Sequence, residues 1–208
     1  MNILICNERF LFRFGADRVL ILLGKGLKDL GHSVSVMGNR YDYEVVKTFA
    51  SQVINVPIGN EYLNLNEFTS DWLEQTSHQH FNYSVPDIVI IGGWPFFSSI
   101  PFFRKAGSKV IYIDFGAVPL EGYSGGALLI QEKLRALRTH YLKEATHIIS
   151  ISDFIANSQS KIESKGKTPV HSVLLGADHM ERPVWQDEKL QRERERGDAA
   201  RLVGKLRL

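Results

Sequence analysis

The sequence predicts an α/β fold: a Rossmann-like parallel sheet of about seven strands, flanked by helices. Short apolar runs alternate along the chain with longer segments of helical periodicity, and this alternation is typical of parallel sheets. The run at residues 87–91 is β-branched and lies between Pro86 and Gly92, as expected for a central strand that is buried on both faces. The predicted strands are residues 3–7, 32–37, 53–56, 87–91, 109–113, 146–151 and 170–175.

The chain opens with a βαβ unit. Its first strand is followed by a polar turn, residues 8–16, and by an amphipathic helix over residues 17–30. Asp17 is predicted to be the N-cap of this helix, and Gly31 can adopt the left-handed conformation that ends it. The predicted apolar face of the helix recurs every three or four residues, at Leu20, Leu23, Leu27 and Leu30.

Further helices connect the later strands. Residues 43–50 predict a short helix, and residues 65–81 predict a polar surface helix. Residues 95–106 predict a helix that is broken or kinked near Pro101. Residues 127–143 predict the longest helix, with Ile130, Leu134, Leu137 and Tyr141 on its apolar face. Its basic residues are predicted to form a solvated face and are Lys133, Arg135, Arg138 and Lys143.

Composition and charge exclude several classes of function. The chain has 208 residues and a formal net charge of +2 with scattered basic residues, which argues against a nucleic-acid partner. Its one cysteine, Cys6, cannot form an internal disulfide and is expected to be a buried, inert thiol. We see no targeting segment and no apolar stretch long enough to span a bilayer, so we expect a cytoplasmic protein that can meet a membrane only at its surface.

In an open parallel sheet, ligands bind at the carboxyl ends of the strands. Two side chains in these loops are candidates for a site. Trp94 follows the central strand, where it either stacks on a sugar ring or packs under the next helix with Phe96 and Phe97. Asp114 begins a long, glycine-rich loop, where it either accepts a hydrogen bond or proton from an acceptor hydroxyl or bonds to its own backbone.

Two weaker signals lie at the starts of helices. Gly15 precedes the first helix, so it is either part of an anion site or an ordinary loop glycine. The dinucleotide-binding and P-loop glycine patterns are both absent, which counts against a nicotinamide enzyme. Ser152 is first an N-cap and only secondarily a ligand contact. No cluster of cysteines, histidines and carboxylates predicts a metal site.

Taken together, these segments resemble the N-terminal half of a GT-B glycosyltransferase of the retaining family 4. The resemblance covers Met1 to about Met180 and depends on the order and spacing of several short stretches. Besides the opening strand, glycine turn and helix, these stretches are residues 27–36, 87–93, 110–116, 145–154 and 175–178.

The resemblance implies an acceptor-binding domain over residues 1–180 and a charged linker or tail over residues 181–208. The linker would lead to a missing C-terminal donor-binding domain. We therefore expect a carbohydrate or lipid-linked acceptor as partner, and a nucleotide-sugar donor as co-substrate, with no tightly bound cofactor and no catalytic metal. The predicted donor-binding residues are Gly15 and Arg18. The predicted catalytic residue is Asp114, and the predicted acceptor-binding residues are Trp94, Phe115, Gly116 and Ser152.

Two other functions remain open at this point. A stand-alone Rossmann-like binding module would need no partner domain, and it should expose no apolar patch at the strand ends. A sugar epimerase of the GT-B fold would need acid–base carboxylates and histidines in the cleft. The acceptor half of a glycosyltransferase should bind its acceptor weakly and turn over little when isolated, because groups from both domains stabilise the transition state.

Overall fold

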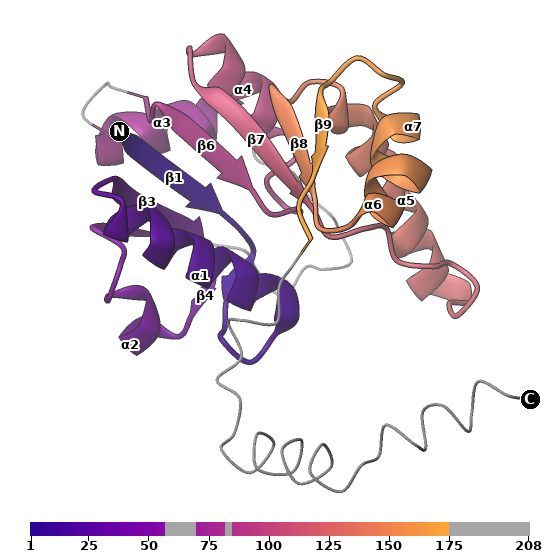
Figure 1. The fold of residues 1–208 in the computed structure, drawn as a ribbon, viewed down its shortest axis with the longest axis horizontal. Helices are drawn as coiled ribbons and strands as arrows, with labels where there is room; N and C mark the ends of the chain where they lie inside the picture. The colour runs from indigo at the N-terminus through magenta and orange to yellow at the C-terminus, as the bar shows by residue number, and fades with distance from the viewer. Residues whose placement is uncertain (57–69, 82–84, 175–208) are drawn as a thin grey trace, which may run out of the picture. The chain divides into compact units, whose positions relative to one another are not determined.

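A seven-stranded sheet in which all neighbouring strands are parallel forms the centre of the protein (Figure 1). The computed structural model describes residues 1–56, 70–81 and 85–174, which all belong to one compact unit, Met1–Leu175. The strands, in their order across the sheet, are β5 (Gln52–Asn55), β3 (Ser33–Gly38), β1 (Asn2–Cys6), β6 (Ile88–Ile91), β7 (Lys109–Asp114), β8 (His147–Ser150) and β9 (Val170–Ser172). The predicted α/β class and parallel seven-stranded sheet are confirmed.

The order of the strands shows where along the sheet a binding crevice is expected. The chain runs outward from β1 through β3 to β5, then returns to add β6 on the other side of β1, so the strand order switches between β1 and β6. The carboxyl ends of strands beside such a switch line the binding crevice of open α/β sheets. Gly92 lies there, and a Cβ on it would meet Leu20 Cδ1 at 2.6 Å and Asn7 Oδ1 at 2.7 Å. Only glycine fits that position without a shift of its neighbours.

Two helical layers cover the two faces of the sheet. Alternate residues of β1 serve opposite layers: Ile3 and Ile5 pack towards α1 and α2, whereas Leu4 and Cys6 pack in the cluster that includes residues of α3, α4 and α5. Burial raises the pKa of the Cys6 thiol, as expected for an inert core cysteine. The larger helices are α1 (Gly15–Asp29), α2 (Tyr43–Val46), α3 (Ser70–Phe81), α4 (Ser99–Lys105) and α5 (Gly125–Leu142).

The remaining elements are short. A two-stranded parallel ribbon pairs β2 (Arg9–Phe10) with β4 (Arg40–Tyr41), and the Phe10 and Tyr41 rings stack with centroids 5.7 Å apart. After β8, one continuous helical segment contains α6 (Asp153–Ile155), the π-helical turn η1 (Ala156–Ser160) and α7 (Lys161–Glu163).

The first helix differs from its prediction at both ends. It begins at Gly15, with Phe14 in the N-cap position, so the predicted Asp17 N-cap is wrong. Asp17 is instead buried in the first turn. The predicted apolar face is also wrong at Leu30, which is 75% exposed because the helix has ended there. Gly31 has φ +83°, which confirms its predicted left-handed conformation.

Two later helices are shorter than predicted. α2 ends at Val46 rather than at residue 50, and α4 begins at Ser99 rather than at residue 95. Pro101 lies in the first turn of α4, where a backbone amide has no acceptor within the helix, and the helix continues through it to Lys105. Phe96 and Phe97 are buried in the core, as the packing alternative predicted.

Several predictions lie outside the described residues. These are the first part of the helix predicted over residues 65–81, the 175–178 stretch, the domain boundary near residue 180 and the tail of residues 181–208. Within the described ranges, no helix has both the length and the apolar character needed to cross a bilayer. The same ranges contain no group of three His, Cys, Asp or Glu side chains able to hold a metal ion.

Candidate functional site

A pocket of about 170 Å³ lies at the carboxyl edge of the sheet. Three segments form its walls: the loop after β6, the end of β7 with the loop that follows it, and one face of α5. The lining residues are Trp94, Phe97, Tyr112, Gly116, Ala117, Val118, Gln131, Leu134, Arg135 and Arg138. We call this the carboxyl-edge pocket. Two of the predicted acceptor-binding residues, Trp94 and Gly116, meet in it.

One stripe of α5 supplies a whole wall of the pocket. Gln131, Leu134, Arg135 and Arg138 are spaced by three, one and three residues, which places them on a single helical face. Arg138 is only 5% exposed, so its predicted place on a solvated face is wrong. The spacing could have predicted this wall, because two arginines and a glutamine lie on the same helical face as the apolar Leu134.

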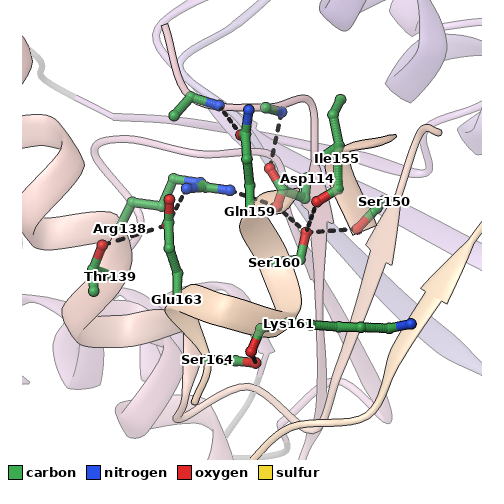
Figure 2. A network of polar contacts seen from close by, with 12 residues as sticks. Asp114, Arg138, Thr139, Ser150, Ile155, Gln159, Ser160, Lys161, Glu163 and Ser164 are labelled. Carbon is green, nitrogen blue, oxygen red and sulfur yellow. Dashed lines mark hydrogen bonds and ion pairs between the residues drawn. The ribbon is translucent and has the colours of Figure 1, made fainter. Parts of the chain in front are cut away.

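Arg138 is buried because two carboxylates surround its guanidinium (Figure 2). Its Nη2 donates to Asp114 Oδ2 at 2.6 Å, and its Nη1 donates to Glu163 Oε2. The Ser160 hydroxyl donates to the same Asp114 oxygen at 2.5 Å. This polar network joins the end of β7 to α5 and to the segment after β8, so it fixes three parts of the chain relative to one another.

The network also fixes the loop wall of the pocket. Asp114 Oδ1 accepts a hydrogen bond from the Gly116 amide at 2.9 Å, as the alternative of an aspartate bonding to its own backbone predicted. Gly116 has φ +93°, a conformation that other residues rarely adopt. The next amide, of Ala117, donates to Gln159 Oε1 at 2.7 Å. Both Gln159 and Ser160 belong to the π-helical turn, a form that is frequent at functional sites.

Burial and neighbouring charges set the protonation of these groups. Burial by itself would lower the pKa of Arg138, but the acidic groups of Tyr112, Asp114 and Glu163 outweigh it and raise that pKa above its ordinary value. Burial also raises the pKa of the Tyr112 hydroxyl, so that group is a neutral donor and acceptor in the pocket wall. The guanidinium therefore stays charged, and its charge is balanced by carboxylates that do not line the pocket.

The other predicted site residues have different surroundings. Asp114 is fully buried and does not line the carboxyl-edge pocket, although it holds Arg138, which does. Phe115 packs against the core on the α1 face. The Ser152 hydroxyl accepts a hydrogen bond from the Ile155 amide at 3.2 Å, which confirms its N-cap role.

The predicted donor-binding residues lie at the start of α1. Gly15 is exposed as the first residue of the helix. Arg18 donates from Nε to the Phe12 carbonyl at 3.0 Å and lies over the Phe12 ring. Beneath them, the buried Asp17 carboxylate accepts from Arg9 Nε at 3.0 Å and from Asn7 Nδ2 at 3.3 Å. Burial raises the pKa of Asp17, and the charge of Arg9 lowers it by less.

A second pocket, of about 450 Å³, lies at the opposite, amino edge of the sheet. Its polar lining is largely satisfied internally: the Ser33 and Ser51 hydroxyls are 3.2 Å apart, and Gln52 Nε2 lies 3.2 Å from His80 Nδ1. Ligands of open α/β sheets bind at the carboxyl edge, so the smaller carboxyl-edge pocket is the candidate site.

Solved structures resemble this fold. A UGT transferase from Siraitia grosvenorii in complex with UDP matches 84% of this chain with a TM-score of 0.50 and 9% identity. A UDP-glucose:anthocyanidin 3-O-glucosyltransferase in complex with UDP matches 83% with a TM-score of 0.50 and 13% identity. The chain has the fold of one half of a GT-B glycosyltransferase.

The chain spans about half the length of both structures, 50% and 52% respectively. No protein-family model and no curated protein matches the sequence. The half-domain likeness therefore concerns the arrangement of strands and helices, and the role of each side chain depends on the geometry described above.

Proposed function

We propose that the chain is the acceptor-binding half of a cytoplasmic glycosyltransferase. In this proposal the complete enzyme transfers a sugar from a nucleotide-sugar donor to a carbohydrate or lipid-linked acceptor, with retention of the anomeric configuration, as in family 4. The observation that carries the proposal is the carboxyl-edge pocket, which combines aromatic and hydrogen-bonding side chains at the edge where open sheets bind ligands. The resemblance of the sequence to family 4 supports retention.

An exposed apolar side chain in the pocket lining favours this function over a stand-alone binding module. Val118, on the loop after β7, lines the pocket and is 46% exposed. A self-sufficient module was expected to expose no apolar patch at the strand ends, whereas an acceptor half has a partner domain and a bound acceptor to cover it.

The pocket lining also argues against an epimerase. Proton abstraction and return need a carboxylate or an imidazole within reach of the substrate. Among the residues that the structure describes, those that line the carboxyl-edge pocket include no Asp, Glu or His. Asp114, the nearest predicted acid or base, has its carboxylate engaged by Arg138 and Ser160.

A transfer assay tests the proposal. The 208-residue chain is incubated with a nucleotide sugar, first UDP-glucose, and a panel of carbohydrate acceptors, with and without a supplied GT-B C-terminal domain. We expect turnover only with that domain, because transition-state stabilisation needs groups from both halves. Full activity of the chain alone would refute the proposal that catalysis needs groups from both domains.

Trp94→Ala provides the site-specific arm of this assay. Removing an aromatic face that stacks on the acceptor should raise KM for the acceptor about tenfold, because ring contacts contribute about 0.5–1.5 kcal/mol beyond the area they bury. Trp94→Phe should retain most of the affinity. Unchanged kinetics of Trp94→Ala would place the acceptor elsewhere.

A further inference from the structure

A buried donor in the wall of the carboxyl-edge pocket has no hydrogen-bond acceptor. Arg138 uses both Nη atoms for Asp114 and Glu163 (Figure 2). The hydroxyl of Tyr112 lies near the same guanidinium. The buried Nε–H of Arg138, however, finds no acceptor of hydrogen-bonding geometry among the described residues. Buried donors are nearly always bonded in native proteins, so Arg138 is a polar side chain of the pocket wall whose bonding is incomplete.

A second arginine gives the pocket its charge. Arg135 lies three residues before Arg138 on the same stripe of α5, and its side chain is exposed. Within the described ranges it forms no ion pair. The charge of Arg138 is balanced by Asp114 and Glu163, neither of which lines the pocket. The pocket therefore offers a ligand the uncompensated positive charge of Arg135.

The size of the pocket limits the ligand group that it holds. Pockets that enclose a whole small molecule usually measure about 300–1,000 Å³. At about 170 Å³, this one holds roughly a single ring. Trp94 and Phe97 supply aromatic surface to such a ring, and Gln131 offers an amide that can bond to hydroxyl groups.

We propose that the carboxyl-edge pocket binds one sugar ring that carries an acidic substituent, a carboxylate or a phosphate. The ring lies against Trp94 and Phe97, and the acidic group pairs with Arg135. This inference rests on the proposed function, since the ring would be the accepting unit of the acceptor. It adds that the acceptor is acidic, which the function by itself does not require.

Titration of the 208-residue chain, followed by NMR, tests the preference. The probes are glucuronate, glucose 1-phosphate, glucose and inorganic phosphate. We expect the two acidic sugars to bind with a Kd of roughly 1 mM, as suits ligands of this size, and glucose to bind at least about tenfold more weakly. Equal binding of glucose overturns the acidic requirement. Phosphate binding as tight as that of glucose 1-phosphate indicates an anion site only and overturns the sugar ring.

The two acidic probes also separate the sources of the charge. A preference for glucuronate supports a uronic acid as the accepting ring, and a preference for glucose 1-phosphate supports a phosphorylated sugar. Both outcomes uphold the shared chemistry of a ring with an anionic group.

Arg135→Gln identifies the side chain responsible. We expect this substitution to weaken the binding of both acidic probes about tenfold and to leave the affinity for glucose unchanged. It removes a charge from an exposed position that the fold does not need. Lys133→Gln is the matched control, since it removes a charge from the same helix outside the pocket lining. Equal losses in the two variants would mean that the general field of α5 attracts the anion, and the assignment to Arg135 would fail.

The binding titration and the transfer assay fail independently. If the chain with a C-terminal domain glycosylates neutral acceptors and binds all probes equally, only this inference is wrong. If acidic sugars bind selectively but no donor and domain combination gives transfer, the proposed function is wrong and the acidic-ring site remains.

Discussion

At the scale of single residues, Arg138 matters most to the site. It is a buried cation held by two carboxylates, and it joins the end of β7 to α5 and α7. A buried ion pair contributes little net stability over an apolar replacement, because both charges have lost their hydration. Removing one partner is different, since it leaves the other charges buried and uncompensated.

Arg138→Met should therefore destabilise the chain by about 3–5 kcal/mol. Arg135→Met, one turn away on the same helix face but exposed, should change stability by no more than about 0.5 kcal/mol. Urea unfolding of both variants measures the two losses. Similar losses in the two variants would contradict the structure, because they would mean that leaving Asp114 and Glu163 without their cation costs no more than changing an exposed side chain.

A second residue-scale prediction concerns Asp17. Because burial raises its pKa, this carboxyl keeps its proton to a higher pH in the folded chain than in the unfolded chain. Its contribution to stability is complete below its unfolded pKa of about 4 and is lost as the pH rises through the raised folded pKa. The free energy of unfolding of the wild type minus that of Asp17→Asn should therefore fall as the pH rises above about 4.

Urea titrations of both proteins at several pH values in that range measure the difference. Any constant offset reports the difference between the neutral carboxyl and the asparagine amide, and the slope reports the titration of Asp17, to which its pairing with Arg9 contributes. A difference that rises with pH would mean that Arg9 outweighs burial and that the pKa of Asp17 is lowered.

At the scale of elements, close packing of α1 depends on a missing side chain. A Cβ on Gly24 would lie 2.4 Å from Cε2 of Phe49, a ring that is itself buried in the core after α2. Gly24 thus sets how closely this helix approaches that ring. Gly26, two residues later, faces open space, because a Cβ added there would meet no atom within 4 Å.

Gly24→Ala should destabilise the chain by about 1–3 kcal/mol through overpacking. Gly26→Ala should stabilise it by about 0.5–1 kcal/mol, because alanine loses less backbone entropy on joining a helix. Thermal unfolding of the pair measures both signs. A gain in both variants would mean that Phe49 moves aside without cost.

At the scale of the whole molecule, stability should fall from the centre of the sheet to its β9 edge. β1 has a strand on each side and helices on both faces, and four of its five residues are buried. β9 is an edge strand with no buried residue. Amides of β1 should exchange with solvent only on global unfolding, and those of β9 by local opening.

Hydrogen exchange followed by NMR measures this gradient. We expect the β9 amides to exchange at least about a hundredfold faster than the β1 amides under native conditions, a difference of about 2.7 kcal/mol in opening free energy. The β7 amides, in a strand paired on both sides, serve as the internal reference and should behave like those of β1. Uniform protection across the sheet would indicate a single cooperative unit that includes β9.

The elements that could be predicted are those whose signal is local. The β-branched run before Gly92 and the left-handed Gly31 depend on neighbouring residues, and both agree with the structure. The predicted Asp17 N-cap failed because its carboxylate bonds to Arg9 and Asn7 across the turn instead of capping α1. Of the candidate site, Trp94 and Gly116 could be placed at the pocket because both follow strands at the predicted edge.

The sequence by itself determined the parallel sheet, the edge where ligands would bind and the loops that form that edge, because hydrophobic periodicity and turn residues act over a few neighbours. Only the tertiary structure decided that Arg138 is buried and that α5 forms a wall of the pocket. The partners of Arg138, Asp114 and Glu163, lie 24 and 25 residues away from it along the chain. A cation on a helix looks solvated until the fold brings carboxylates to it, and the Coulomb attraction that offsets its lost hydration exists only in the assembled core.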